Sequence, residues 1–171
     1  MDSPYKKSIW DFDARYGIDS AEIGDSERKT ISRLMSVDAA KKNVPPVPIS
    51  GLLEISNLAK GMPDAVSATK EDIENFIGLA KRFNGAGVPT VICMLAVETD
   101  GDYPPMDRRF SSGLEKKGIV SKAYRKSLKG GSIKKFSRVY VEKVIPAWKE
   151  SLKGRTPQEA DNYWGRGGSD G

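Results

Sequence analysis

The sequence predicts an all-α domain, and three observations lead to this prediction. Apolar residues recur at spacings of three and four along most of the chain, as on one face of a helix. Capping and turn residues divide this pattern into segments of helical length. No segment alternates apolar and polar residues like a half-buried strand, and no internal repeat is present. With 171 residues, 38% of them hydrophobic, residues 1–171 are expected to form one compact multi-helix domain with its own core.

Five helices are expected before residue 119, over residues 26–43, 50–60, 69–83, 88–96 and 107–118. The connector at residues 44–48 contains three prolines, which exclude a helix there. Thr69-Lys70-Glu71-Asp72 resembles a capping box and begins the clearest of these helices. Asp107 is suited to cap the fifth helix, and Gly118 is suited to end it.

Three further helices are expected, over residues 120–128, 136–152 and 157–164. Pro146 lies inside the second of these and is expected to kink it. Pro157 follows Thr156 and stands at the first helical position of the third, where proline is favourable. The glycine-rich end of the chain, residues 165–171, is predicted to be a frayed tail.

The composition excludes several kinds of chemistry. Histidine is absent and Cys93 is the only cysteine, so disulfides, cysteine-rich clusters, histidine-ligated zinc and histidine-based catalysis are ruled out. Cys93 lies in an apolar run and is interpreted as a small buried residue. No metal site is expected. No segment approaches the about 18 apolar residues of a membrane span, and the N-terminal segment lacks a signal-peptide core, so a cytoplasmic protein without membrane contact is expected.

Basic residues are concentrated in one part of the chain. The formal net charge is +5, yet the stretch from Lys116 to Arg138 has nine basic residues and no acidic one. Such a stretch suits the phosphate backbone of a nucleic acid, and we assign Lys126, Lys129 and Lys135 to DNA contacts. A solvated face without a partner is the alternative interpretation.

A glycine turn separates two of the expected helices. In Gly85-Ala86-Gly87 the glycines allow positive φ and a close approach of the backbone to a partner. The turn amides and the start of the next helix can then face a phosphate. By itself the turn is more typical of an ordinary helix C-cap, because helices often end at glycine.

Two segments around this turn resemble the helix-hairpin-helix DNA glycosylase superfamily. The segment from Phe83 to Val91 is similar to that family's Leu-Pro-Gly-Val-Gly-x-x-Thr-Ala hairpin. The segment from Tyr103 to Arg109 resembles its Pro-Val-Asp-Thr-x-x-x-Arg segment, and the separation of the two segments agrees. The resemblance covers residues 69–120, with the helix-hairpin-helix at residues 69–98, and it implies a DNA-glycosylase-like helical fold.

The resemblance implies roles for individual residues. Asp107 matches the aspartate that stabilises the cationic sugar or activates water during hydrolysis of the glycosidic bond. Gly85, Ala86, Gly87 and Val88 match the hairpin that binds DNA phosphate, often together with a monovalent cation. Arg108 is assigned to DNA as well. Pro89 stands where members with lyase activity have a nucleophilic lysine, so no Schiff-base step and no further cofactor are expected. For Asp107 alone, a helix cap without chemistry is the alternative.

The pocket for the base is less well defined by the sequence. Tyr103, Trp10 and Trp164 are candidates for stacking on a base flipped out of the duplex, whereas core packing is expected for Trp148. Glu98, Asp100 and Asp102 precede Asp107 and are interpreted as a solvated acidic loop, because their spacing fits no calcium loop.

The residues together lead to a functional hypothesis with two alternatives. We expect a DNA-binding protein resembling a monofunctional DNA glycosylase, which would hydrolyse the N-glycosidic bond of a modified or damaged base in DNA. A non-catalytic DNA-binding module on the same fold is the main alternative. Another base- or nucleotide-directed enzyme on this fold is the second. The sequence does not specify the base or any protein partner.

Overall fold

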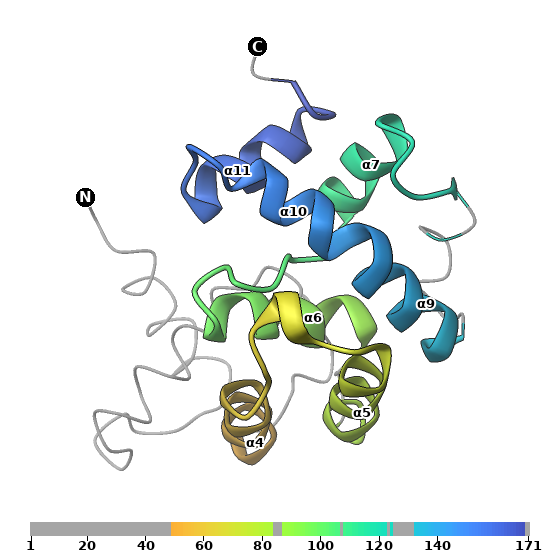
Figure 1. Cartoon of the computed structure of the whole chain (residues 1–171). Helices are drawn as coiled ribbons and strands as arrows, with labels where there is room; N and C mark the ends of the chain where they lie inside the picture. The colour runs from red at the N-terminus through yellow and green to blue at the C-terminus, as the bar shows by residue number, and fades with distance from the viewer. Residues whose placement is uncertain (1–48, 84–86, 107, 123, 125–131, 170–171) are drawn as a thin grey trace.

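The computed structural model describes residues 49–83, 87–106, 108–122, 124 and 132–169 (Figure 1). The regular elements in these residues are all helices, with no strand among them, so the all-α prediction is confirmed for this part of the chain. The helix expected at residues 26–43 lies outside it, as does most of the helix expected at 120–128. None of the helices described combines the length and the hydropathy that a membrane crossing requires.

The first described helices begin at the expected positions. Helix α4 (Ile49–Lys60) is followed by the 3-10 turn η2 (Ala65–Ser67) and by α5 (Lys70–Ala80). Thr69 caps α5 with the predicted capping box, in which the Asp72 amide donates to Thr69 Oγ1 at 3.2 Å and the Thr69 amide donates to Asp72 Oδ2 at 2.9 Å. Helix α5 ends at Ala80, three residues before the expected end.

Helix α6 (Val88–Glu98) is the most deeply buried element of the described fold. Every residue from Thr90 to Ala96 is buried, which agrees with the unbroken apolar run at residues 91–97. A helix that is apolar on all sides must be surrounded by other elements. Helices α4 and α5 pack against it, and Cys93 is buried there as predicted.

Helix α7 (Arg108–Lys116) ends as its sequence predicts. Phe110 and Leu114 face the core and are fully buried. Gly118 has a φ of 71° and its amide donates to the Glu115 carbonyl at 3.0 Å, while the Ile119 amide donates to the Leu114 carbonyl at 2.9 Å. These two bonds form a Schellman motif, which needs the left-handed conformation that glycine adopts without strain.

One long helix runs from α9 (Ile133–Val139) through a π-helical segment, η3 (Tyr140–Val144), into α10 (Ile145–Ser151). Pro146 has no amide to donate, and its ring would clash with the carbonyl four residues earlier in an α-helix. The π-helical segment lies directly before Pro146, and the Ile145 amide donates five residues back, to the Tyr140 carbonyl. The irregularity expected at Pro146 is thus a local widening of the helix.

The last helix corrects the expectation of a frayed tail. Helix α11 (Pro157–Gly165) includes Gly165. Gly167 and Gly168 have φ near 77° and 78°, and their amides donate to the carbonyls of Trp164 and Tyr163 at 2.9 and 3.1 Å. These glycines form a C-terminal cap because they adopt positive φ readily. The backbone of residues 165–169 is therefore defined, and of this tail residues 170–171 lie outside the described part.

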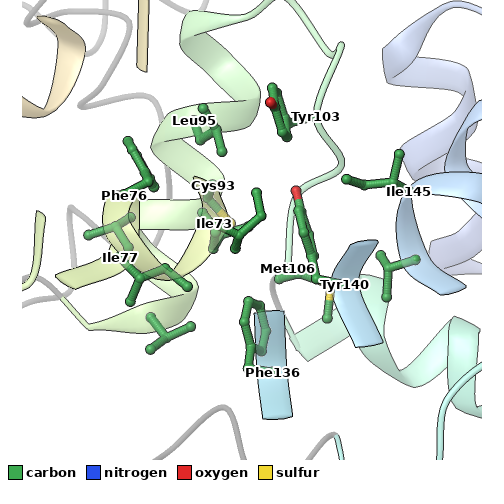
Figure 2. Packing of buried hydrophobic residues seen from close by; sticks show 14 of the residues in the cluster. Ile73, Phe76, Ile77, Cys93, Leu95, Tyr103, Met106, Phe136, Tyr140 and Ile145 are labelled. Atoms are coloured by element: carbon green, nitrogen blue, oxygen red, sulfur yellow. The ribbon is translucent and has the colours of Figure 1, made fainter. Parts of the chain in front are cut away.

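The helices form two groups that meet across the core (Figure 1). Helices α4, α5 and α6 make one group, and α7, α10 and α11 make the other. Helix α9 packs on α5 and so joins the two groups. At this junction the rings of Tyr124, Phe136 and Tyr140 stack in sequence, with centroids 5.5 and 5.6 Å apart, and Figure 2 shows Phe136 and Tyr140 beside Ile73 and Ile77 of α5.

Candidate functional site

The segment between α6 and α7, residues 99–106, leads to the predicted catalytic position and is called the α6–α7 loop below. Its backbone turns sharply at Asp100 and Gly101, which have φ of 51° and 81°. The Gly101 amide donates to the Ala96 carbonyl at 2.9 Å and so caps α6. A side chain at residue 101 would come within 2.5 Å of Pro157 Cβ. Both the conformation and the close approach of α11 therefore require glycine.

Two buried tyrosines bind backbone carbonyls around this loop. Tyr103 donates from its hydroxyl to the Pro63 carbonyl at 2.5 Å, and Tyr140 donates to the Pro104 carbonyl at 2.7 Å. Burial raises the pKa of both hydroxyls far above the usual range, and nearby carboxylates such as that of Asp102 raise it further. Both groups therefore remain protonated donors at neutral pH. Figure 2 shows the Tyr140 hydroxyl directed toward the loop.

Helix α10 and the turn η2 hold the same loop from two further sides. Trp148 donates from Nε1 to the Gly101 carbonyl at 2.8 Å. Lys149 forms an ion pair with Asp102 Oδ1, and the Ala65 amide donates to Asp102 Oδ2 at 2.8 Å. The side chains of Lys149 and Asp102 are only 29% and 32% exposed. Asp102 is thus a structural bridge among three segments that are distant in the sequence.

These bonds fix the approach to the start of α7. The loop ends at Met106, whose side chain is fully buried, and α7 begins at Arg108. Asp107 lies outside the described residues, so its predicted role stays a prediction.

The solvated acidic loop expected at residues 98–102 is only partly observed. Asp100 is exposed, but Asp102 forms the bridge described above and Glu98 accepts a hydrogen bond from the Ser56 hydroxyl at 2.6 Å. The expectation is corrected for these two carboxylates, because each compensates a donor that packing has brought to the loop. Within the described ranges, no group of three or more potential metal ligands is present.

The glycine turn is described only at its end. Gly85 and Ala86 lie outside the described residues, whereas Gly87 is the N-cap of α6 with an extended backbone, φ −83°. Val88 is buried at the first turn of the helix, and Pro89 follows it. The amides of this first turn have no partner within the helix. Pro89 contributes neither an amide nor an amine there.

The predicted basic contacts are described at two positions. Arg108 is exposed at the start of α7, and Lys135 is exposed on α9 beside Lys134 and Arg138. The same helix buries Phe136 and Ser137, so its basic side chains share the outer face. Lys126 and Lys129 lie outside the described residues, and the DNA contacts assigned to all of these residues remain predictions.

The described aromatic candidates for a base pocket lie in the core. Tyr103 is fully buried and Trp164 is 5% exposed. The Trp164 ring packs edge-on against Phe110 at 6.1 Å, and Phe110 also packs against Trp148, which is buried as expected. In this arrangement neither candidate offers a ring face to a flipped base, because core side chains cover both rings. Trp10 lies outside the described residues.

Three residues that hold the loop were not among the predicted functional residues. Tyr140, Trp148 and Lys149 follow one another along η3 and α10, where the helical pattern indicated only a core stripe. The sequence signal that was available is the polar group on each side chain, since a buried hydroxyl or indole nitrogen needs an acceptor. The acceptors lie 36 to 47 residues earlier in the chain, and no local pattern indicates them.

In comparisons with protein families, curated proteins and solved structures, no match to this chain was found.

Proposed function

We propose that this protein binds DNA and hydrolyses the N-glycosidic bond of a modified or damaged base, with Asp107 as the catalytic carboxylate. The proposal combines the resemblance of residues 69–120 to the helix-hairpin-helix glycosylases with the arrangement of the described helices. In support, α5 and α6 are consecutive, pack against each other and flank the glycine turn. The α6–α7 loop then leads to residue 107.

The observation that supports this proposal most is the anchoring of the α6–α7 loop. Five groups from outside the loop hold it: the Pro63 carbonyl, the Ala65 amide and the side chains of Tyr140, Trp148 and Lys149. These five polar contacts come from three separate segments and give the loop a defined course. A catalytic carboxylate does need a fixed position, because its effect depends on being placed before the charge develops.

The chemistry requires only a carboxylate and water. As the bond between the base and the sugar breaks, its electron pair leaves with the base and positive charge develops on the sugar. A carboxylate at residue 107 would stabilise that charge or take a proton from the attacking water. Pro89 at the position of the family's lysine offers no amine, so the products are a free base and an abasic site without strand cleavage.

Charge is distributed in a way that supports a nucleic-acid partner. Residues 49–106 contain four basic and eight acidic residues, whereas residues 108–169 contain sixteen basic and five acidic ones. The basic residues thus belong to the part of the chain that forms α7 to α11. A field of one sign over part of a molecule attracts a polyanion and orients it as it approaches.

The test is base release by the wild-type protein and by Asp107→Asn. The substrates are DNA duplexes that contain alkylated, oxidised, deaminated or hypermodified bases, measured in single turnover. We expect Asp107→Asn to lower the release rate at least about 100-fold, while duplex affinity stays equal or rises because a negative charge near phosphate is lost. Asn caps a helix about as well as Asp, so stability should change little.

Asp100→Asn is the matched control. Asp100 is exposed in the same loop, and asparagine tolerates its positive φ, so the same chemical change there should leave the rate unaltered. Release that survives Asp107→Asn would remove Asp107 from the mechanism. No release from any duplex, together with salt-dependent binding, would instead favour the non-catalytic DNA-binding module.

A further inference from the structure

Arg109, in the first turn of α7, has a guanidinium group that is exposed and yet fixed in place. Its Nη2 donates to Asn162 Oδ1 of α11 at 2.9 Å. The two helices already pack tightly without this bond, because Phe110 and Trp164 meet in the core. A single exposed hydrogen bond adds little to such packing. Its more evident effect is to hold the arginine in one orientation.

Gly165 leaves the space in which the Arg109 guanidinium group lies. A Cβ atom at residue 165 would overlap Arg109 Nε and Nη2 and would lie 2.5 Å from Cζ. The guanidinium group therefore occupies the space that a side chain at residue 165 would fill. Glycine in a helix is less stable than alanine by about 1 kcal/mol, and here it leaves the room that Arg109 occupies across the end of α11.

Other arginines with a fixed guanidinium group have different partners. Arg82 pairs with the carboxylate of Glu54 and lies over the Phe83 ring. Arg155 lies 4.3 Å from the centre of the Tyr163 ring and donates to the Ser151 carbonyl at 3.1 Å. Arg109 has the neutral amide of Asn162 and, among the described residues, no carboxylate within ion-pair distance. No described carboxylate therefore neutralises its charge.

The surroundings increase the attraction of this position for an anion. Arg108 and Arg166 are exposed next to Arg109 and Gly165 in the sequence, and Lys116 and Lys117 are exposed at the end of α7. The acidic residues of α7 and α11 are Glu115, Glu159 and Asp161, of which Glu159 closes the capping box with Thr156. A fixed guanidinium with free donors matches the paired oxygens of a phosphate.

We infer that Arg109, oriented by Asn162 and Gly165, binds a phosphate of the DNA backbone. This inference rests on the proposed function, because it takes DNA as the ligand. It adds a contact outside the glycine turn and outside the stretch from Lys116 to Arg138. The contact lies on the same helix turn that follows Asp107, so it would hold the backbone next to the nucleotide on which the carboxylate acts.

The test compares binding of a labelled 20-base-pair duplex by full-length variants over a range of salt concentrations. We expect Arg109→Gln to weaken binding about tenfold and to lower the slope of log affinity against log salt by about one. Gly165→Ala keeps the arginine but fills its space, so it should give the same two changes while the helix itself becomes slightly more stable. Gly78→Ala is the matched control, since no atom lies near that position in α5.

The outcomes separate this inference from the proposed function. If the wild-type protein binds the duplex in a salt-dependent way and Arg109→Gln binds equally well, the phosphate contact is wrong and DNA binding stands. If Arg109→Gln weakens binding but Gly165→Ala does not, the orientation by Gly165 is wrong, and the inference fails in that form. If the wild-type protein shows no salt-dependent binding, the proposed function and the inference fail together.

Discussion

The two groups of helices differ in charge and in what holds them together. In the group of α4, α5 and α6, the other two helices pack against α6, whose residues from Thr90 to Ala96 are all buried, and the group belongs to the acidic part of the chain. The group of α7, α10 and α11 belongs to the basic part and packs around the aromatic rings of Phe110, Trp148 and Trp164. Each group is thus held mainly by apolar contacts, as expected for packed helices.

The contacts between the two groups include polar bonds in addition to the apolar contacts of α9 and η3 with α5. Hydrogen bonds and an ion pair from η3 and α10 reach the α6–α7 loop, and they involve Tyr140, Trp148 and Lys149. Polar bonds depend on direction, whereas apolar contacts tolerate sliding. The position of the α6–α7 loop relative to the basic helices is therefore set by polar bonds. The arrangement of the helices within each group is set by the fit of their apolar side chains.

The largest expected effect of a single substitution is on packing within the basic group. A Cβ atom at Gly113 of α7 would overlap the Trp164 carbonyl oxygen and lie 2.7 Å from its carbonyl carbon. Backbone cannot move aside as a flexible side chain can, so Gly113→Ala should lower the free energy of unfolding by about 3 kcal/mol. Urea denaturation measures this. Gly78→Ala, which meets no atom, should gain about 0.5–1 kcal/mol, and equal stability of the two variants would contradict the close packing of α7 on α11.

High pH should weaken the junction between the groups. Burial raises the pKa of Tyr103, Tyr124 and Tyr140 far above the usual range. Above about pH 10 these tyrosines ionise in the unfolded chain but stay protonated in the fold. The unfolded state then binds fewer protons, so stability falls as pH rises, by about 1.4 kcal/mol per pH unit for each tyrosine. Below pH 10 the contribution is complete and stability should not depend on these groups.

Denaturation between pH 9 and pH 11.5 checks this expectation. Tyr140→Phe should reduce the slope of the free energy of unfolding against pH by about 1.4 kcal/mol per pH unit, the contribution of one tyrosine. The variant starts from a lower stability because the Pro104 carbonyl loses its donor. Tyr163, which is partly exposed on α11, provides the comparison. If Tyr163→Phe reduced the dependence of stability on pH as much as Tyr140→Phe does, the assignment of the effect to the buried hydroxyls would be contradicted.

Local sequence patterns predicted most of the described helices because their signals are local. The capping box at Thr69, the proline at the start of α11 and the glycine that ends α7 each act within a few residues. The glycines at residues 167 and 168 were misjudged as a frayed tail, since glycine both ends helices and favours disorder. The choice between these outcomes depends on the residues that the turn packs against, here the side chains of Lys116 and Lys117.

The candidate site was predicted less completely than the fold. The glycine turn and Asp107 were predicted from a resemblance in short motifs. Asp107 and most of the glycine turn lie outside the described residues. Arg109 and Asn162 are 53 residues apart in the chain, and the space above Gly165 exists only because α7 crosses α11 there. Such pairings depend on the crossing of helices, and local sequence patterns do not indicate which helices cross.

The smallest expected effect distinguishes the ion pair at the junction from an ion pair at the surface. Asp102 and Lys149 are 32% and 29% exposed, whereas Glu150 of α10 and Lys153 in the turn after it are 72% and 75% exposed. Partial burial reduces screening by water, and the Ala65 amide also fixes Asp102. A double-mutant cycle with Asp102→Asn and Lys149→Met should give a coupling of about 1 kcal/mol. The cycle with Glu150→Gln and Lys153→Met should give close to zero, because water screens that pair. Equal couplings in the two cycles would mean that the polar bonds at the junction are no stronger than those at the surface. Polar bonds would then not account for the position of the α6–α7 loop relative to the basic helices.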